Sequence, residues 1–289
     1  MDIPELLARR AGPVFSFEFF LPKAPADIEA FLATVRQLQE LDPAFVTLTY
    51  GAGGSARTKT VETAARLQRE LGLETCCHLT CISHTREEIS ELLDRIEASG
   101  IRHIVALRGD PPKDAAPPCG PRDFGYARDL VAFIKSRGGF HLAVAGYPET
   151  HPEAPSPEFD LENLKAKLLA GGDWVITQLF FDNADYFRFV ARARAAGISA
   201  PIVPGIMPVT GYAQLQRFTR LCGAGIPEEL SRRLDAVQND PEAVIACGID
   251  WAARQCRELL RGGAPGVHFF TLNRTRSTAE ILRRLRSSA

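Results

Sequence analysis

Glu18 is the most unusual chemistry-bearing residue of the chain, because it lies within the otherwise apolar segment Val14–Phe20. If this segment is a β-strand, alternation places Glu18 on the same face as Ser16 and Phe20. A carboxyl group among aromatic rings has its charged form disfavoured, which predicts a raised pKa. Such a group suits a general acid near neutral pH. The competing interpretation is a buried glutamate that is satisfied by a salt bridge.

Two further polar residues accompany apolar segments. Asp110 follows Arg108 and Gly109, and its alternatives are a functional carboxylate, a loop cap, or an ion pair with Arg108. Gln178 lies within Val-Ile-Thr-Gln-Leu-Phe-Phe. An amide both donates and accepts hydrogen bonds, so Gln178 suits the edge of a heterocycle, although it could equally satisfy a backbone group.

The sequence patterns that could indicate a metal site or a phosphate-binding loop are weak. Cys76, Cys77, His78 and Cys81 cluster in one strand-like segment, but adjacent strand residues point to opposite faces, which argues against a shared zinc ion. The glycine-rich stretch 51–54 is more often a tight turn than a phosphate cradle. The odd count of seven cysteines, without regular spacing, favours free thiols over a disulfide framework.

Eight short β-type segments are expected to position these residues. They are Val14–Phe20, Phe45–Tyr50, Glu74–Ile82, His103–Arg108, Leu142–Tyr147, Trp174–Phe181, Pro201–Met207 and Gly266–Leu272. Several are apolar on both faces, as in parallel strands covered by helices. Parallel strands need helical crossovers, so the series predicts a closed (β/α)8 barrel. An open doubly wound sheet normally carries G-x-G-x-x-G after an early strand, and none follows the first strand here.

Helix-like stretches separate these segments. Ala26–Leu41 repeats its apolar residues at helical spacing, and Thr85–Ser99 opens with the Thr85 and Glu88 spacing of a capping box. Glu158–Ala170 and Asn183–Ala196 both end before glycines. The stretch Gly211–Gly262 is too long for one helix, so we expect two or three extra helices between the last two strands.

In such a barrel the chemistry lies at the carboxyl ends of the strands. The polar groups that the sequence places at or near these ends are Glu18, Thr49, Tyr50, His78, Thr80, Arg108, Asp110, Tyr147, His151, Gln178, Asn273 and Arg274. A barrel built only for stability has no need of so many polar groups at one rim. The proline-rich loop Pro111–Pro121 follows the fourth segment, and loops of this length are often functional.

Charge and hydrophobicity limit the kinds of partner that the protein can bind and the cell compartment in which it is expected. The net charge of −1 gives no basic surface for nucleic acid or for an anionic membrane. The N-terminal ten residues lack the apolar core of a signal peptide, and no apolar run approaches the length of a membrane span. We therefore expect a cytoplasmic protein, folded as one catalytic domain over residues 1–289.

Eight motifs in order resemble the bacterial methylenetetrahydrofolate reductase family, from Phe15 to about Arg274. They are FSFEFF (15–20), VTLTYGA (46–52), HLTC (78–81), HIVALRGD (103–110), YPETHPEA (147–154), ITQLFFD (176–182), PGIMPV (204–209) and FFTLNR (269–274). The resemblance implies an FAD-carrying barrel that reduces 5,10-methylenetetrahydrofolate to 5-methyltetrahydrofolate. NADH or NADPH is the reductant, and the folate binds after the nicotinamide has left.

The resemblance also assigns roles. Glu18 matches the acid that protonates folate N10, and Asp110 matches an aspartate beside the flavin N1 and O2 edge. Gln178 matches a glutamine that hydrogen-bonds the pterin. Positions matching FAD contacts are Thr49, Tyr50, Ala52, His78, Arg108, Gly109, Asp110, Ala127, Tyr147, His151, Ala154, Asp160, Asn163 and Lys167. Arg108 and Lys167 are expected to pair with the FAD diphosphate. Gln214, Phe218 and Arg274 match substrate-side positions, with Phe218 an aromatic that stacks on substrate or nicotinamide.

Some positions depart from the family pattern. Leu21 replaces a common proline, and Ala166 stands where some relatives carry an arginine near the FAD phosphates. The loop 111–125 aligns poorly, which affects the position of Ala127. The chain ends at Ala289, so we expect no S-adenosylmethionine-binding regulatory domain. The resemblance further implies a homo-oligomer, a dimer or tetramer, and leans toward NADH.

Two other classes of function compete with this interpretation. A metal-dependent barrel lyase or aldolase would need clustered carboxylates and histidines at the rim, whereas the groups here are scattered. A non-catalytic folate- or flavin-binding barrel is disfavoured by the combination of Glu18, Asp110 and Gln178.

Overall fold

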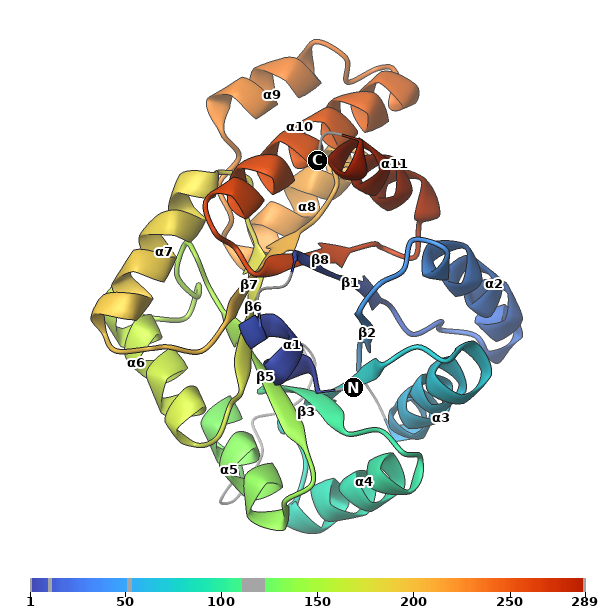
Figure 1. Cartoon of the computed structure of the whole chain (residues 1–289), viewed down its shortest axis with the longest axis vertical. Helices are drawn as coiled ribbons and strands as arrows, with labels where there is room; N and C mark the ends of the chain where they lie inside the picture. Colours follow the sequence, from blue (N-terminus) through green and yellow to red (C-terminus); the bar gives the residue numbers. More distant parts are fainter. Residues whose placement is uncertain (1, 10–11, 51–53, 111–122, 288–289) are drawn as a thin grey trace.

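The computed structural model describes residues 2–9, 12–50, 54–110 and 123–287. Eight parallel strands follow one another around a closed barrel, and the last strand pairs with the first (Figure 1). The strands are β1 (Val14–Phe19), β2 (Phe45–Leu48), β3 (Thr75–Thr80), β4 (His103–Leu107), β5 (His141–Gly146), β6 (Trp174–Leu179), β7 (Ile202–Ile206) and β8 (Gly266–Phe270). The prediction of a (β/α)8 barrel is confirmed, with strands one to three residues shorter than most of the predicted segments.

Helices cover the outside of the barrel. They are α2 (Ile28–Gln39), α3 (Gly54–Leu71), α4 (Arg86–Ala98), α5 (Ala127–Arg137), α6 (Pro157–Leu169), α7 (Asn183–Ala195) and α11 (Thr275–Arg286), with a short 3-10 turn, η1 (Pro25–Asp27), before α2. Outward-facing strand residues such as Phe17 and Leu48 pack in one core with the apolar stripes of the helices, for example Leu32 and Val35. The predicted capping box begins α4, where the Thr85 hydroxyl accepts from the Glu88 backbone N–H.

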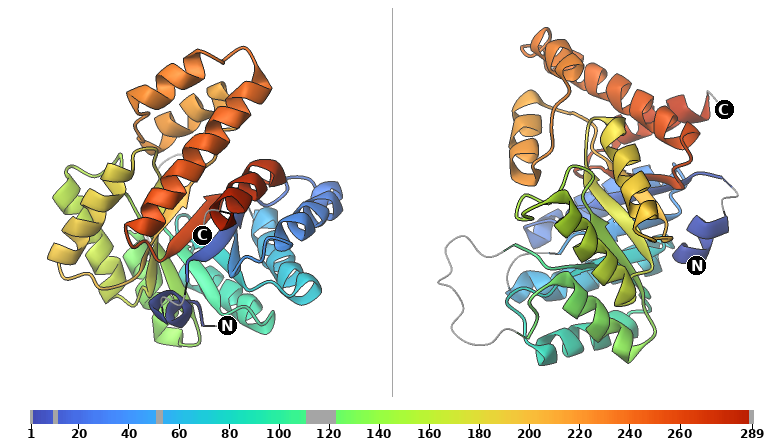
Figure 2. Two further views of the ribbon diagram at one scale, coloured as in Figure 1. Left: turned by 45° about the horizontal axis from the view of Figure 1, so that its top comes forward. Right: turned by 90° about the vertical axis from the view of Figure 1, so that its left-hand side faces the viewer.

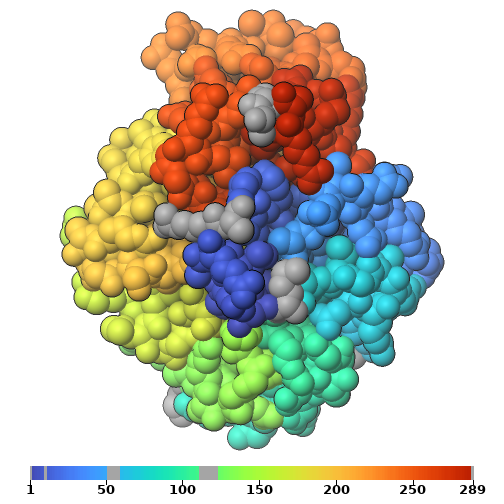
Figure 3. Space-filling model, viewed as in Figure 1, coloured from blue at the N-terminus to red at the C-terminus, as the bar shows by residue number. Residues whose placement is uncertain are grey.

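A short helix that the sequence analysis did not assign, α1 (Ile3–Arg9), closes the amino-terminal mouth of the barrel. Its Ile3 and Leu7 are buried among inward-facing strand residues, including Phe45 and Trp174. In the space-filling view α1 covers the centre of this face (Figure 3). The side view places α1 and α8 at opposite ends of the barrel (Figure 2, right). The amino-terminal mouth is thereby sealed, which leaves the carboxyl ends of the strands for function.

Three helices separate β7 from β8, as predicted: α8 (Tyr212–Cys222), α9 (Glu228–Asp235) and α10 (Pro241–Arg261). Their apolar faces form a separate core with Met207 and Leu179 from the strand ends. Gly248 lets α10 approach closely, because a Cβ there would lie 2.1 Å from the carbonyl oxygen of Val209. The insertion therefore packs tightly beside the carboxyl ends of β6 and β7. Among the described residues, no helix is both long enough and apolar enough to cross a membrane.

Candidate active site

Two cavities that share a wall open near the carboxyl ends of the strands. The outer cavity, about 290 Å³, lies between the end of β4, the β5–α6 loop and the helices α5 and α6. The central cavity, about 530 Å³, lies over the barrel axis and reaches the β7–α8 region. Residues common to both linings are Leu107, Asp110, Ala145, Tyr147, His151 and Glu153.

Most of the predicted site residues meet in these two cavities. The central cavity is lined by Glu18, Thr49, His78, Asp110, Tyr147, His151, Gln178 and Phe218. The outer cavity is lined by Arg108, Gly109, Asp110, Ala127, Tyr147, His151, Ala154, Asp160, Asn163 and Lys167. Predicted residues from six strand ends and three helices thus surround one connected space.

Four predicted residues are not placed there. Tyr50 and Gln214 line neither cavity. The Tyr50 hydroxyl lies 3.1 Å from His84 Nε2, and the Gln214 side chain accepts a hydrogen bond from the Thr210 hydroxyl. Arg274 is exposed at the start of α11, outside both linings. Ala52 lies outside the described residues.

The surroundings of Glu18 correct one prediction. Its Oε2 lies 3.4 Å from His78 Nε2 and 3.6 Å from His268 Nε2, two imidazoles with little exposure to solvent. The Thr47 hydroxyl approaches the same oxygen at 3.4 Å. Burial alone raises the pKa of Glu18, but hydrogen bonding and charge from His268 and His78 outweigh it and lower the pKa to about 2. The predicted upward shift was therefore wrong, because it counted the aromatic neighbours and omitted the two imidazoles.

His268 is a site residue that the sequence analysis missed. It lies on β8, opposite Ser16 of β1 in the register that closes the barrel, and both residues are fully buried. The Ser16 hydroxyl lies 2.8 Å from His268 Nδ1, which leaves Nε2 facing Glu18. Only the pairing of the first strand with the last brings Ser16, Glu18 and His268 together. Inward alternation in β8 was the one available signal.

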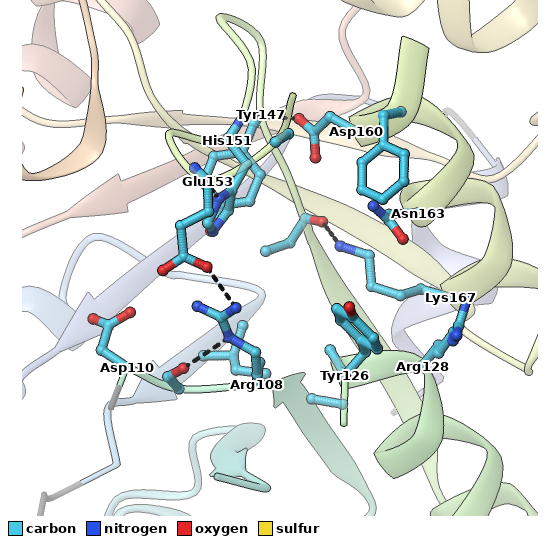
Figure 4. A pocket seen from close by; sticks show the side chains of 17 residues that line it. Arg108, Asp110, Tyr126, Arg128, Tyr147, His151, Glu153, Asp160, Asn163 and Lys167 are labelled. Atoms are coloured by element: carbon cyan, nitrogen blue, oxygen red, sulfur yellow. Dashed lines mark hydrogen bonds and ion pairs between the residues drawn. The ribbon is translucent and has the colours of Figure 1, made fainter. Parts of the chain in front are cut away.

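Arg108 is paired with Glu153 rather than with Asp110. Its Nη1 donates to Glu153 Oε2 at 2.6 Å, and its Nε donates to the Gly109 carbonyl oxygen (Figure 4). This contact raises the pKa of Arg108 and lowers the pKa of Glu153. Asp110 is exposed and lines both cavities. Its charge adds to the rise in the pKa of Arg108 without a direct contact between the two side chains. Glu153, a lining residue that was not predicted, therefore occupies this guanidinium in the structure.

Lys167 places a second cation at the outer cavity. Its amine donates to the Ala145 carbonyl oxygen at 2.5 Å, and desolvation lowers the pKa of Lys167 to about 8 (Figure 4). Across the cavity, Tyr147 packs edge-on against His151, with ring centroids 4.6 Å apart. Burial raises the pKa of Tyr147 to about 12, so its hydroxyl stays protonated at neutral pH. The β5–α6 loop is held to α6 because the His151 backbone N–H donates to Asp160.

Gln178 lies where the pairing of β6 with β7 is irregular. The register shifts between Ile176 and Leu179, and the Thr177 hydroxyl accepts from the Gly205 backbone N–H within this interval. The Gln178 amide oxygen accepts from the Leu179 backbone N–H at 2.9 Å. The structural alternative is thus partly correct, since one end of the amide satisfies a backbone group. Gln178 nevertheless lines the central cavity, and irregular strand pairing of this kind commonly redirects a side chain.

Comparison with known proteins agrees with this architecture. The family model for methylenetetrahydrofolate reductase matches residues 4–286. The 5,10-methylenetetrahydrofolate reductase of Pectobacterium carotovorum is 43% identical over 259 residues, covering 90% of this chain and 85% of that protein. Methylenetetrahydrofolate reductase (NADH) 1 of Arabidopsis thaliana is 40% identical, and the match covers 99% of this chain but only 50% of the plant protein.

One solved structure shares the fold across almost the whole chain. It is an uncharacterised Clostridium thermocellum protein that binds two copies of 5-methyl-5,6,7,8-tetrahydrofolic acid. The two chains superpose with a TM-score of 0.69 over 98% of each, at 12% sequence identity, so this likeness shows the barrel alone. The family match over nearly the full sequence, together with the 43% identity to a bacterial relative, shows more than the fold. By these two criteria the chain belongs to the methylenetetrahydrofolate reductase family.

Proposed function

We propose that this protein reduces 5,10-methylenetetrahydrofolate to 5-methyltetrahydrofolate, with bound FAD and with NADH or NADPH as reductant. The observation that carries the proposal is the position of Glu18, which faces a cavity large enough for a heterocycle and contacts two buried imidazoles. The adjoining outer cavity offers cations and aromatic rings for a dinucleotide. Nicotinamide and folate would use the central cavity in turn.

The outer cavity fits FAD by the chemistry of its lining. Lys167 is a desolvated amine whose contacts are a carbonyl oxygen and the longer-range charge of Asp160, so an approaching diphosphate would restore its ordinary pKa. Arg108 offers a guanidinium, whose planar donors suit phosphate oxygens. Its present partner Glu153 is 57% exposed on its side chain, so it can turn into solvent when a phosphate takes its place. FAD, when bound, accepts hydride from the nicotinamide and passes it to the folate.

Glu18 and its two imidazoles supply the proton. Opening the five-membered ring of the folate requires protonation of N10, which yields the N5 iminium cation that accepts hydride. A carboxyl group with a pKa of about 2 is ionised at neutral pH, so Glu18 must first receive the proton that N10 accepts. We infer that it reaches N10 through Glu18, while the Ser16 hydroxyl holds the orientation of His268.

Asp110 and Gln178 complete the site. Asp110 borders both cavities, where its negative charge would favour the cationic iminium over the neutral folate. Gln178 lines the central cavity and carries an amide whose oxygen is already engaged, which leaves its N–H donors for the pterin edge. Phe218 lies on the same lining as an aromatic face for a planar ligand.

The visible spectrum of the purified protein tests the proposal in one cuvette. Flavin bands should bleach after anaerobic addition of NADH and return after addition of methylenetetrahydrofolate. A protein that shows no flavin bands after reconstitution with FAD would refute the cofactor assignment. Repeating the first step with NADPH tests reductant preference, for which the NADH in the name of the plant relative supports NADH. Assembly as a dimer or tetramer stays a prediction.

A further inference from the structure

The β5–α6 loop and the turn between α8 and α9 pack closely against each other beside the central cavity. Gly223 ends α8 with a φ of 75°, and a Cβ atom there would lie 3.2 Å from Cγ of Pro152 in the β5–α6 loop. At Gly225 a Cβ atom would lie 3.0 Å from Glu149 Oε1. Two glycines therefore let the turn approach the loop more closely than larger residues would.

Glu149 joins these two segments by a hydrogen bond. Its Oε1 accepts from the Gly225 backbone N–H at 2.7 Å. Its Oε2 is shielded from solvent and has no hydrogen-bond partner among the described residues. A buried carboxyl oxygen without a partner costs free energy, which favours a role of Glu149 in function over a role in stability alone.

The groups around Glu149 do not neutralise its carboxyl group. Burial raises the pKa of Glu149, and the hydrogen bond from Gly225 opposes that rise. The carboxylates of Asp185 and Asp182, at the start of α7, raise the pKa further. Arg188 lowers it at longer range, but this guanidinium is itself bound to Asp185. The contact that Glu149 supplies is therefore the hydrogen bond to the turn rather than an ion pair.

The two joined segments line different parts of the site. Tyr147 and His151 of the β5–α6 loop line both cavities, whereas Phe218 and Cys222 of α8 line only the central one. The loop is fixed to α6, because the His151 backbone N–H donates to Asp160. The separation of α8 from this fixed loop therefore sets the width of the central cavity on that side.

Helix α8 has little buried surface of its own to hold it in place. Of its eleven residues, all of which the structure describes, only Leu215 and Thr219 are buried. Its N-cap residue, Gly211, has no side chain to cap the first turn. Elements with few buried contacts open at a low cost in free energy. The position of α8 should therefore depend on the hydrogen bond just beyond its end.

We propose that Glu149 is a positioning residue that anchors the end of α8 to the β5–α6 loop and so holds Phe218 at the central cavity. The inference rests on the proposed function and deepens it, because nicotinamide and folate would bind in turn in the cavity whose width Glu149 maintains. Without the anchor, α8 occupies its binding-competent position for less of the time, and the apparent affinity for both ligands falls by that fraction. The described lining of the outer cavity includes no residue of α8, so FAD binding should not change.

Steady-state kinetics of the flavin-loaded protein test the anchor. Glu149→Ala removes the acceptor, and Glu149→Asp keeps the charge on a side chain too short to reach Gly225. Each should raise the KM for NADH and for methylenetetrahydrofolate about five- to tenfold and leave kcat within about twofold of wild type. Glu149→Gln keeps an acceptor at the same length and should retain wild-type KM values. The matched control is Glu228→Ala, which removes an 86% exposed carboxylate at the start of α9 and should also behave as wild type.

Two further measurements separate the anchor from a general effect on the fold. Amide hydrogen exchange, followed by mass spectrometry, should be faster across α8 in Glu149→Ala and Glu149→Asp and unchanged in Glu149→Gln. The Kd for FAD should stay within about twofold of wild type in all three variants.

Unchanged KM values in the alanine and aspartate variants would overturn the proposal, as would equal losses in KM and in FAD affinity. A Glu149→Gln variant that behaves like Glu149→Ala would also overturn it. If the wild-type protein reduces no folate, the proposed function fails, and hydrogen exchange across α8 alone then decides whether Glu149 anchors this helix.

Discussion

At the scale of single residues, the chemistry of Glu18 is decided by atoms from distant parts of the chain. Desolvation favours the protonated acid, but two imidazoles from β3 and β8 lie within 3.6 Å of its Oε2 and favour the carboxylate. The pKa that results is about 2, so the free enzyme holds a carboxylate at neutral pH. Its role in proton transfer therefore depends on His78 and His268 as much as on Glu18 itself.

Glu18→Gln tests the assignment of this proton-transfer role. The variant keeps the size of the side chain but cannot carry a proton to N10, so folate reduction should fall by at least about 100-fold. Oxidation of NADH by the bound flavin should stay within about twofold of wild type, since that step needs no proton at N10. Stopped-flow absorbance measures the two half-reactions separately. Loss of both to the same degree would show that Glu18 is structural.

The lowered pKa of Lys167 leads us to expect that the affinity for FAD depends on pH. Its pKa in the free site is about 8, below the ordinary value near 10.5, and a bound diphosphate should raise it again. Binding then takes up a proton above pH 8, so the Kd for FAD should rise up to about tenfold per pH unit from pH 8 toward pH 10. Lys167→Arg keeps its charge and should flatten this dependence. Equal slopes for wild type and Lys167→Arg would contradict the assignment.

The same shift has a consequence for the stability of the flavin-free protein. The folded state holds the Lys167 proton less tightly than the unfolded state, so the unfolded chain binds more protons between about pH 8 and pH 10.5. The contribution of Lys167 to the free energy of unfolding therefore increases with pH across that window, opposite to its effect on FAD affinity.

At the scale of elements, the turn after β8 holds the end of β1. Leu272 and Asn273 both adopt left-handed backbone conformations, with φ of 54° and 56°. The Asn273 amide accepts from the Phe20 backbone N–H at 2.8 Å and donates to the Phe20 carbonyl oxygen at 2.9 Å. A side chain thereby continues the β1–β8 pairing by one residue and holds Phe20 at the rim of the central cavity.

Two substitutions at Asn273 separate these hydrogen bonds from backbone strain. Asn273→Gly loses both bonds but tolerates the left-handed conformation, whereas Asn273→Ala loses the bonds and adds strain. Both should raise the folate KM several-fold because Phe20 is released. Only the alanine variant should add about 1 kcal/mol of further destabilisation in urea unfolding. An unchanged folate KM in both variants would show that Phe20 needs no such tether.

At the scale of the whole molecule, the two ends of the barrel have different tasks. The amino-terminal mouth is filled by α1 and a small apolar core, while both cavities lie near the carboxyl end. Because the two ends are separate, side chains at the amino-terminal end determine stability and those at the carboxyl end determine chemistry.

Leu7→Ala tests that division. Leu7 is 1% exposed beneath the barrel, so its truncation should lower the free energy of unfolding by about 2–5 kcal/mol. Circular dichroism in urea measures the loss. At 25 °C the folded variant should keep wild-type kcat and Kd for FAD, because Leu7 lines neither cavity. A marked change in kcat at unchanged folded fraction would show that the two ends are coupled.

Local physical rules account for what the sequence by itself determined. The apolar runs, the Thr85–Glu88 capping box and the glycines after the helices act over a few residues, so eight strands and the helices after β7 were predictable. The polar residues at the strand ends were visible for the same reason. Most of them line the two cavities once the strands are parallel.

Tertiary structure alone decided the features that join distant residues. The pairing of β1 with β8 puts His268 beside Glu18, more than 200 positions away in sequence, and so reverses the predicted direction of the Glu18 pKa shift. The folding of α1 into the barrel mouth and the capture of Arg108 by Glu153 are equally non-local. Burial and charge act through space, so their balance at Glu18 could be evaluated only after the barrel had closed.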